Sequence, residues 1–273
     1  MSADSTVHKT DSSVENHTGI RIRPYYEHAG ITIYHGDCRD VLPSLAPGSV
    51  DLVLTDPPYG IGFSYGTETY TDRSAGYEDW MWPTLEVAER AIKPTGCFGV
   101  FQSAKNARMW ARWFPREWRL IAIPKLFVQM NTALLTWATD YCLLWTMPEA
   151  PRGRQEWQPS PARDWFVSKD SCIPRTGPEK DHPCPRAPDM MRHLLHCLCP
   201  PGGIALDPFS GAGTTLLEAR KMHLAAIGIE IEERYCEIAA KRLSQDVFDW
   251  EIPQTTEGEP DEGDNLFSTL ESA

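Results

Sequence analysis

Short apolar runs alternate with stretches of helical periodicity through most of the chain. Seven of these runs are rich in β-branched and aromatic residues and predict strands. The predicted strands are Ile31–Tyr34, Val50–Thr55, Cys97–Phe101, Trp118–Ile123, Tyr141–Thr146, Ile204–Leu206 and Ala225–Ile229. Strands that alternate with helices are typical of a mostly parallel sheet covered by helices. The pattern therefore predicts an α/β fold with a seven-stranded, doubly wound sheet.

Five segments have apolar residues at helical spacing. The first spans about Asp79 to Ile92, ends before a Pro-Thr-Gly turn and places Pro83 in its first turn. The other four begin after Ser103 as N-cap, at Pro188, after Gly213 and after Glu230. The helix that begins at Pro188 carries its apolar residues on one face, which indicates packing against the sheet.

Residues 1–20 and 251–273 lack hydrophobic periodicity and are rich in polar and acidic residues. They are expected to be disordered tails on either side of one domain, residues 21–250. Within that domain, Met147–Pro185 is rich in proline and shows no sustained periodicity. We expect it to be an irregular insert carried by the regular core, with a role in target recognition.

The net charge of −12 is distributed unevenly. Residues 251–273 contain seven acidic and no basic residues, whereas residues 104–192 contain fourteen Lys and Arg against nine Asp and Glu. The overall acidity therefore does not exclude a nucleic-acid partner, because the central stretch is suited to face phosphates.

Cysteine content and hydropathy bear on the cellular location. Eight cysteines without any Cys-x-x-Cys do not form a disulfide framework, so a reducing, cytoplasmic setting is expected. No apolar run reaches the length of a membrane helix, and the first residues are too polar for a signal peptide. Secretion and a membrane partner are not expected.

The first motif that suggests chemistry is Asp56-Pro57-Pro58-Tyr59, directly after the strand Val50–Thr55. The two prolines hold the chain in an extended turn at the carboxyl end of a strand, where open α/β sheets bind their ligands. An exocyclic amine on a flat base is suited to donate its hydrogens to Asp56 and the Pro57 carbonyl while its ring stacks on Tyr59. Taken alone, the motif also fits a strand-ending loop whose aspartate caps a neighbour.

A second motif follows the strand Ile204–Leu206 and precedes a helix. The glycines of this motif, Gly211 and Gly213, allow positive φ and a close ligand approach. The N-terminus of the helix that follows favours a negatively charged group. Glu230 stands 23 positions after Asp207, the spacing at which an acid meets a ribose hydroxyl. The predicted residues of this adenosine-type cofactor site are Asp207, Phe209, Gly211, Gly213, Thr214 and Glu230.

The two motifs together resemble the amino-group DNA methyltransferases that use S-adenosylmethionine. Their order, with the catalytic motif first, resembles the permuted β group of that family. Gly36-Asp37-Cys38 and Gly228-Ile229-Glu230 match the same pattern. His182-Pro183-x-Pro185-Arg186 resembles the element before the cofactor strand, although the family typically shows Lys-Pro where this chain has Arg186-Ala187.

The resemblance implies a Rossmann-like methyltransferase fold with one reversed strand. It also implies that Asp56 and the Pro57 carbonyl hold the amine of a flipped base and that Tyr59 stacks on that base. In the cofactor site, it implies that Glu230 binds the ribose hydroxyls and that Asp37 lies near the adenine. The residues expected to wrap the methionine part are Phe209, Gly211 and Gly213.

The resemblance implies a bacterial or phage-encoded, nucleoid-associated enzyme that acts on double-stranded DNA. Asp rather than Ser at position 56 favours the N6 amine of adenine, because the cytosine N4 enzymes of this family more often carry Ser-Pro-Pro. Cytosine N4 is the alternative. RNA and protein-glutamine methyltransferases mostly carry the cofactor motif first, and neither motif is damaged as in a non-catalytic relative. A homodimer and a restriction endonuclease partner stay open.

DNA contacts are predicted within the insert, where arginines stand beside tryptophans. The predicted residues are Arg152, Arg154, Trp157, Arg163 and Trp165. A cluster of cysteines and histidines later in the chain is not assigned to a metal, because no pair has the usual ligand spacing. That cluster comprises Cys172, His182, Cys184, His193, His196, Cys197 and Cys199.

Overall fold

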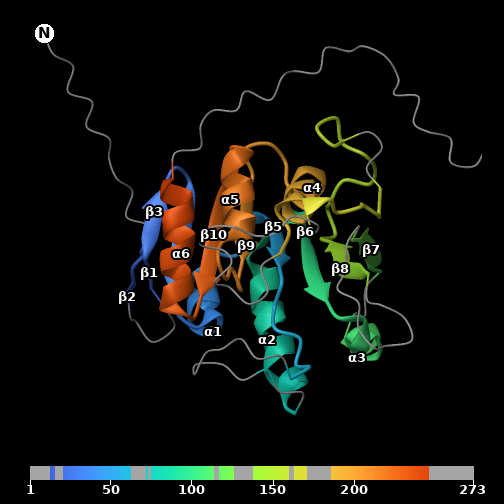
Figure 1. Ribbon diagram of the computed structural model, residues 1–273, viewed down its shortest axis with the longest axis horizontal. Helices are drawn as coiled ribbons and strands as arrows, with labels where there is room; N and C mark the ends of the chain where they lie inside the picture. The colour runs from blue at the N-terminus through green and yellow to red at the C-terminus, as the bar shows by residue number, and fades with distance from the viewer. Residues whose placement is uncertain are drawn as a thin grey trace, which may run out of the picture.

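The central feature of the computed structural model is a mixed sheet with helices on both faces (Figure 1). The structure describes residues 13–15, 21–62, 72, 75–113, 117–125, 138–159, 163–170 and 186–245. Eight strands lie in the order β3-β4-β10-β9-β5-β6-β8-β7. They are β3 (Tyr26–His28), β4 (Ile31–His35), β5 (Val50–Thr55), β6 (Ile92–Gln102), β7 (Arg119–Pro124), β8 (Thr139–Thr146), β9 (Ile204–Asp207) and β10 (Ala225–Glu230).

The strand directions confirm the predicted α/β fold class. Strands β4, β10, β9, β5 and β6 are parallel, and β8 runs antiparallel to both β6 and β7. Among the seven predicted strands, β8 is therefore the one reversed strand. The predicted count is one strand short, because β3 pairs antiparallel with β4 at the edge of the sheet.

The five predicted helices are present in the predicted order, and the short helix α1 (Cys38–Val41) was not predicted. The others are α2 (Tyr77–Arg90), α3 (Ala107–Trp113), α4 (Pro188–Leu198), α5 (Thr214–Lys221) and α6 (Glu233–Ser244), with short 3-10 turns η1 (Leu42–Ser44) and η2 (Ala104–Asn106). The prediction for α2 was wrong at its start, since the helix begins at Tyr77 and Pro83 lies inside it. None of the described helices has the length and apolar character of a membrane span.

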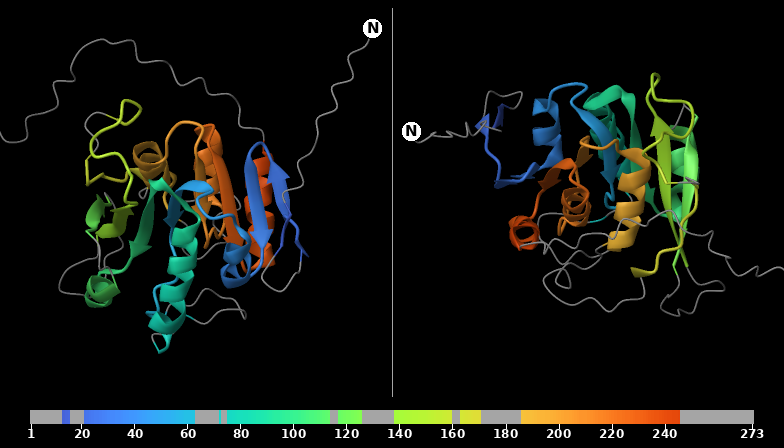
Figure 2. Two further views of the ribbon diagram at one scale, coloured as in Figure 1. Left: turned by 180° about the vertical axis from the view of Figure 1, so that it is seen from behind. Right: turned by 90° about the horizontal axis from the view of Figure 1, so that it is seen from above.

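Two apolar cores hold the layers together. Helices α4, α5 and α6 cover one face of the sheet, and α1 and α2 cover the other (Figure 2). Strand β5 serves both cores, because Leu52 and Leu54 point to the first and Val50 and Val53 to the second. A strand buried on both faces gives an apolar run, here interrupted only by Asp51 before the final Thr55, which explains why β5 is recognisable in the sequence.

The predicted tails are only partly covered by the structure. Residues Val14–Glu15 form β1, which pairs antiparallel with β2 (Arg21–Ile22). The expectation of disorder over residues 1–20 was therefore wrong for this pair. The acidic segment 251–273 lies outside the described residues.

The insert begins at the opposite end of the sheet from the carboxyl ends of the parallel strands. Because β8 is reversed, the chain leaves it beside the start of β6, where Met147 and Glu149 donate backbone hydrogen bonds. The loop that follows, residues 150–159, lies at that end (Figure 1). The insert is not wholly irregular, because residues 163–168 return along the outer edge of β7.

The end of the insert is fixed to the start of α4. The Asp189 carboxylate accepts hydrogen bonds from the Ser168 hydroxyl at 2.8 Å and from the N–H of Lys169 at 2.7 Å. In return, Asp170 accepts from the N–H of Asp189 at 3.1 Å. The segment 163–170, which runs beside β7, is therefore anchored to the core.

Asp51 should stabilise the sheet by linking three strands. Its buried carboxylate on β5 accepts from Lys93 Nζ on β6 and from the N–H of Ile204 on β9, each at 2.9 Å. Asp51→Ala leaves both donors without this acceptor, so the free energy of unfolding should fall by about 1–3 kcal/mol in urea unfolding. The exposed Asp164→Ala is the control. Equal unfolding midpoints for the two variants would contradict this role.

Candidate active site

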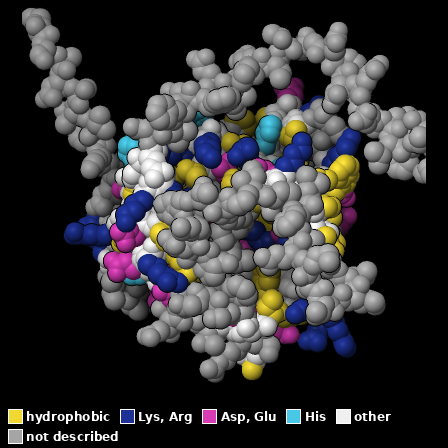
Figure 3. All heavy atoms as spheres, viewed as in Figure 1, with side chains coloured by type: hydrophobic (Ala, Val, Ile, Leu, Met, Phe, Trp, Pro, Cys, Tyr) yellow, Lys and Arg dark blue, Asp and Glu magenta, His cyan; other side chains and the backbone are white. Residues whose placement is uncertain are grey.

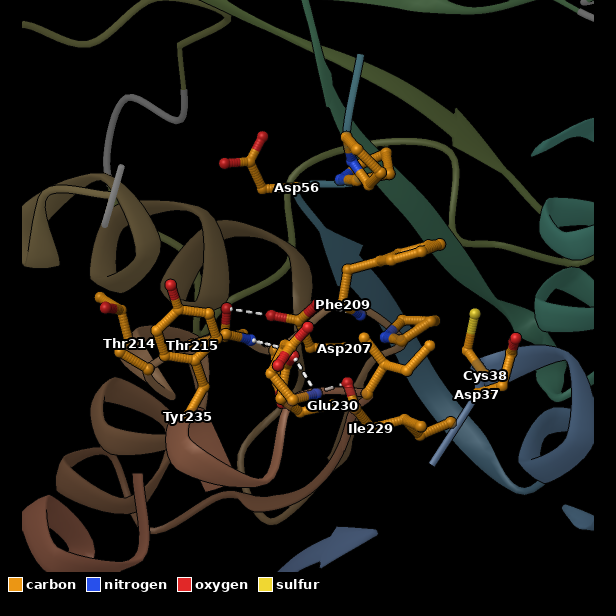
Figure 4. A pocket seen from close by; sticks show the side chains of 18 of the residues that line it. Asp37, Cys38, Asp56, Asp207, Phe209, Thr214, Thr215, Ile229, Glu230 and Tyr235 are labelled. Carbon is orange, nitrogen blue, oxygen red and sulfur yellow. Dashed lines mark hydrogen bonds between the residues drawn. The ribbon is translucent and has the colours of Figure 1, made fainter. Parts of the chain in front are cut away.

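A cavity of about 470 Å³ opens at the carboxyl ends of the parallel strands. Its size lies in the range of small-molecule sites. The ends of β4, β5, β9 and β10 all contribute, so the two sequence motifs lie in the same cavity. Figure 4 shows Asp56 on one side, Glu230 and Asp37 on the other, and Phe209 between them. All predicted catalytic and cofactor residues except Gly213 are thus brought together from distant parts of the sequence.

Glu230 ends β10 and is almost fully buried. Its carboxylate accepts hydrogen bonds from the N–H of Gly211 at 2.8 Å and of Glu232 at 2.9 Å. Burial raises the pKa of Glu230 to about 7, despite these two donors. One lone pair on each carboxylate oxygen remains for a ligand, which suits two ribose hydroxyls.

The cavity also contains an unsatisfied buried oxygen. Glu232 Oε1 is buried and accepts no hydrogen bond from any residue that the structure describes. Because Glu232 lines the cavity, a hydroxyl or amino group of a bound ligand would satisfy this atom. The residues present therefore fit a polar, adenosine-type group.

Asp37 caps the short helix α1 at the same end of the cavity. Its side chain accepts from the N–H of Arg39 at 2.9 Å and forms an ion pair with the Arg39 guanidinium. Burial would raise the pKa of Asp37, but the hydrogen bonds from Arg39 outweigh it and lower that pKa. Arg39 in turn lies 5.9 Å from the ring of Trp80, which contacts Phe209 edge to face. Arg39 and Trp80 line the cavity too, although no sequence motif predicts this.

Asp207 organises the glycine-rich turn from inside the protein. It is buried and accepts hydrogen bonds from the hydroxyls of Thr55 at 2.7 Å and Thr215 at 2.6 Å. The N–H of Phe209 also donates to it at 3.2 Å. Burial raises the pKa of Asp207 to about 6. Its observed role is to fix the turn that carries Phe209 into the cavity.

The two glycines of the turn have different roles. Gly211 and the neighbouring Thr214 line the cavity, as predicted for a close ligand approach. Gly213 does not line it, so its predicted contact with the cofactor finds no support. Gly213 has φ +76°, and a Cβ there would lie 2.8 Å from the side chain of Ala239 on α6. It is required for the turn into α5 and for helix packing.

The loop after Asp56 is held in place by its backbone N–H groups. Asp72 is buried and accepts from the N–H of Gly60 at 2.6 Å and of Ile61 at 3.0 Å. Gly60 has φ +67°, and a Cβ there would lie 2.6 Å from the ring of Tyr77. The loop can therefore lie flat against α2 only with glycine at this position.

Two of the loop's carbonyls are also engaged. The Tyr77 hydroxyl donates to the Pro58 carbonyl at 2.8 Å, and Asn106 Nδ2 donates to the Tyr59 carbonyl at 2.6 Å. In contrast, the Pro57 carbonyl accepts no hydrogen bond from any described residue. The Pro57 carbonyl, which is predicted to accept a hydrogen bond from the target amine, is therefore available.

Asp56 does not stand alone at its end of the cavity. The Tyr59 hydroxyl donates to Asp56 Oδ1 at 2.6 Å, and the Arg186 guanidinium donates to both carboxylate oxygens. Arg186 also forms an ion pair with Asp140 at the start of β8. Neither residue was predicted to belong to the site. Arg186 was noted only in a motif that departs from the family pattern, and Asp140 lies in no motif.

The predicted DNA-binding residues occupy two different places. Arg152, Arg154 and Trp157 lie at the far end of the sheet, about 20 Å from the catalytic loop by the rise along β6. Arg163 and Trp165 lie on the outer edge of β7, with the Arg163 guanidinium 5.1 Å from the exposed Trp165 ring. The structure brings none of the five to the cavity lining.

The cysteine and histidine cluster is only partly described. Within the described part of the chain, no group of three His, Cys, Asp or Glu side chains is arranged to hold a metal ion. His193 stacks on Phe166, and Cys197 and Cys199 are buried. Cys172, His182 and Cys184 lie outside the described residues.

A family model for DNA methylases, of the N6 and N4 amino-group type, matches residues 50–241. This match covers more than half of the chain and includes both motifs, so the chain belongs to the amino-group DNA methyltransferases. The curated relative M.ScaI, a Type II methyltransferase of Streptomyces caespitosus, is 27% identical over 258 residues. That alignment covers 81% of this chain and 84% of the relative.

Solved structures show the same fold. The PvuII DNA methyltransferase, described as cytosine-N4-specific, matches with a TM-score of 0.67 at 19% identity over 80% of this chain and 88% of that chain. M1.HpyAVI in complex with S-adenosylmethionine matches with a TM-score of 0.55 at 20% identity, over 78% of this chain and 99% of that chain. These structures confirm the Rossmann-like fold. Membership of the amino-group DNA methyltransferases supports S-adenosylmethionine as the cofactor.

Cofactor affinity should depend on pH through Glu230. Because its pKa is raised to about 7, the Glu230 carboxyl group of the ligand-free protein loses its proton as the pH rises through neutrality. Because the ionised form accepts hydroxyl hydrogen bonds better, affinity for S-adenosylmethionine should increase between about pH 6 and about pH 8. Calorimetric titration should show this increase, and Glu230→Gln should remove it and weaken binding by about 1.5–3 kcal/mol at the higher pH.

The exposed Glu237→Gln on α6 is the matched control, since it makes the same change outside this cavity. It should keep the wild-type pH dependence. An affinity that stays constant with pH in the wild type would contradict the assignment of Glu230.

Proposed function

We propose that this chain transfers a methyl group to the N6 amine of adenine at a specific sequence in double-stranded DNA. The observation that carries the proposal is the Asp56 carboxylate beside the open Pro57 carbonyl, across the cavity from Glu230 (Figure 4). These two acceptors match the two hydrogens of an amine on a flat base. Asp rather than Ser at position 56 favours adenine.

The residues at this end of the cavity can prepare the amine for attack. An exocyclic amine is a weak nucleophile, because its lone pair is delocalised into the ring. Acceptance of both hydrogens by Asp56 and the Pro57 carbonyl favours a pyramidal nitrogen with its lone pair directed away from them. S-adenosylmethionine, when bound, supplies an electrophilic methyl group. Positioning and electrostatics then account for the rate.

The base must leave the duplex to reach Asp56. Base flipping costs a few kcal/mol, which stacking and edge hydrogen bonds offset. Tyr59 is proposed as the stacking residue. Its ring lines the cavity, and its hydroxyl is held by Asp56, so that the ring has a fixed orientation before the base arrives.

Methylation of the N4 amine of cytosine is the second candidate. The PvuII enzyme that shares the fold is described as cytosine-N4-specific. Both bases present an amine with two hydrogens, so the acceptor pair alone does not distinguish them. The identity of residue 56 is the feature that favours adenine.

Asp56→Ala should lower methyl transfer by about 100-fold or more, because the amine loses a charged acceptor. Cofactor binding should stay nearly unchanged, since Asp56 lies across the cavity from Glu230. Sequencing of modified bases in DNA from cells that express each variant reports activity, base and site together, and calorimetry reports cofactor binding. The exposed Asp79→Ala on α2 is the control.

Turnover by the Asp56 variant at the wild-type rate would contradict the mechanism. A wild-type protein that modifies cytosine at N4 would favour the second candidate. A wild-type protein that modifies no DNA base would contradict the proposed function.

DNA phosphates are proposed to contact the basic face of η2 and α3. Lys105, Arg108 and Arg112 are exposed there, directly after the carboxyl end of β6. Asn106, between the first two, is bonded to the carbonyl of Tyr59 in the catalytic loop. Lys and Arg side chains gather over α3 at the lower right of Figure 3. A base that reaches Asp56 leaves its flanking phosphates near this end of the sheet.

The salt dependence of DNA binding can distinguish this surface from the loop of residues 150–159. Each phosphate contact adds about one unit to the slope of log affinity against log salt. The double variant Lys105→Ala, Arg108→Ala should therefore lower the slope by about two units in fluorescence anisotropy. The matched variant Arg152→Ala, Arg154→Ala removes the same charge at the far end and should leave the slope nearly unchanged. The reverse result would assign the phosphates to the insert.

A further inference from the structure

Arg186 makes an unusually complete set of contacts at the catalytic carboxylate. Nε donates to Asp56 Oδ2 at 2.6 Å, and Nη2 donates to Asp56 Oδ1 at 2.9 Å. Nη2 also contacts the hydroxyl of Tyr59. Such a side-on, two-bond pair fixes both the position and the plane of a carboxylate, which a single ammonium group does not.

These bonds leave a defined remainder of acceptor capacity. An ionised carboxylate offers about four lone-pair positions. Arg186 and Tyr59 together occupy both positions on Asp56 Oδ1 and one position on Oδ2. What remains is one lone pair on Oδ2 and the open carbonyl of Pro57, one acceptor for each hydrogen of an amine.

Arg186 is itself held from behind. Its Nη1 lies 2.8 Å from Asp140 Oδ2, and Lys125 Nζ on the far side of that carboxylate lies 3.1 Å from Oδ1. The guanidinium also lies 4.7 Å from the ring centroid of the buried Phe101, a cation–π distance. Only 12% of the Arg186 side chain is exposed.

The charges in this chain of contacts alternate and stabilise one another. Burial would lower the pKa of Arg186, but Asp56 and the other anionic neighbours outweigh it and raise that pKa well above its usual value. Likewise, burial would raise the pKa of Asp140, but Arg186 and Lys125 outweigh it and lower that pKa. Arg186 and Asp140 therefore both remain charged, and the two-bond pair with Asp56 persists.

We propose that Arg186, anchored by Asp140, is a positioning residue that orients Asp56 so that one oxygen lone pair faces the target amine beside the Pro57 carbonyl. This inference rests on the proposed methylation of a base amine. It adds that Arg186 and Asp140, two residues outside the catalytic motif, determine which lone pair of Asp56 remains free for the amine. Arg186 lines the cavity beside Asp56 and acts through that carboxylate.

For the orientation of Asp56, the planar shape of the Arg186 guanidinium should be as important as its charge. Arg186→Lys keeps the positive charge but cannot bond both carboxylate oxygens in the same plane. Asp140→Asn keeps the size of the anchor but removes its charge. Arg186→Ala leaves a space that a free guanidinium ion can enter, which permits chemical rescue.

Arg192→Ala is the matched control. Arg192 stands on α4, six positions after Arg186, and also donates to a carboxylate, that of Glu218, at 2.7 Å. Glu218 keeps Lys221 as a partner at 2.6 Å when Arg192 is removed. The control therefore removes a comparable ion pair that is not part of the cavity lining.

The experiment measures kcat and KM for DNA methylation, together with calorimetric affinity for S-adenosylmethionine. Arg186→Lys and Arg186→Ala should lower kcat by about 100-fold, the scale expected for misplacement of a reacting group by about 1 Å. Asp140→Asn should lower kcat by a smaller factor, on the order of tenfold. KM for DNA and cofactor affinity should stay within about threefold of the wild type. Millimolar guanidinium chloride should raise kcat of Arg186→Ala, whereas sodium chloride at equal ionic strength should not.

Two results would overturn the inference. One is a wild-type kcat for both Arg186→Lys and Asp140→Asn. The other is a loss of cofactor affinity by the same factor as the loss of kcat, together with lower thermal stability and no rescue by guanidinium. That result would make Arg186 a purely structural residue. A wild-type protein without activity on any DNA would instead overturn the proposed function, and this inference with it.

Discussion

The hydrogen bond from the Thr55 hydroxyl to the buried carboxylate of Asp207 joins the two halves of the site. These residues are 152 positions apart in the chain, yet they end the neighbouring strands β5 and β9. Asp207 also accepts from Thr215, in the first turn of α5 after the glycine-rich turn. A single carboxylate therefore sets the relative position of the strand that leads to Asp56 and the turn that carries Phe209. The geometry between the two sequence motifs therefore depends on this junction.

Features with local physical signatures could be predicted from the sequence. Strand β5 is buried on both faces and is apolar from Val50 to Leu54 apart from Asp51. The prolines of the catalytic motif and the glycines of the cofactor turn mark the ends of strands. The short edge strand β3 was missed, because three residues carry no periodicity. Arg186 and Asp140 were missed as a pair, because their contact is between distant segments and neither residue has a distinctive neighbourhood in the sequence.

Charge was the weaker guide, for a reason that the topology explains. The excess of basic residues over 104–192 is real, but composition does not say at which end of a sheet each residue emerges. Because β8 runs antiparallel to β6, the residues that follow β6 and those that follow β8 lie at opposite ends of the sheet. Lys105 and Arg152 therefore face different regions of solvent although both belong to the same basic stretch. The reversal of β8 thus divides one basic stretch of the sequence between two surfaces.

The segment beside β7 also limits how copies of this protein can associate. Its backbone already pairs with Ala122 and Lys125, so the outer edge of the sheet is occupied at these positions. Edge strands with free backbone groups are the usual template for strand addition and aggregation. The opposite edge is the three-residue strand β3, too short to nucleate a long ladder. Neither edge of the eight-stranded sheet therefore favours its extension from one molecule into the next.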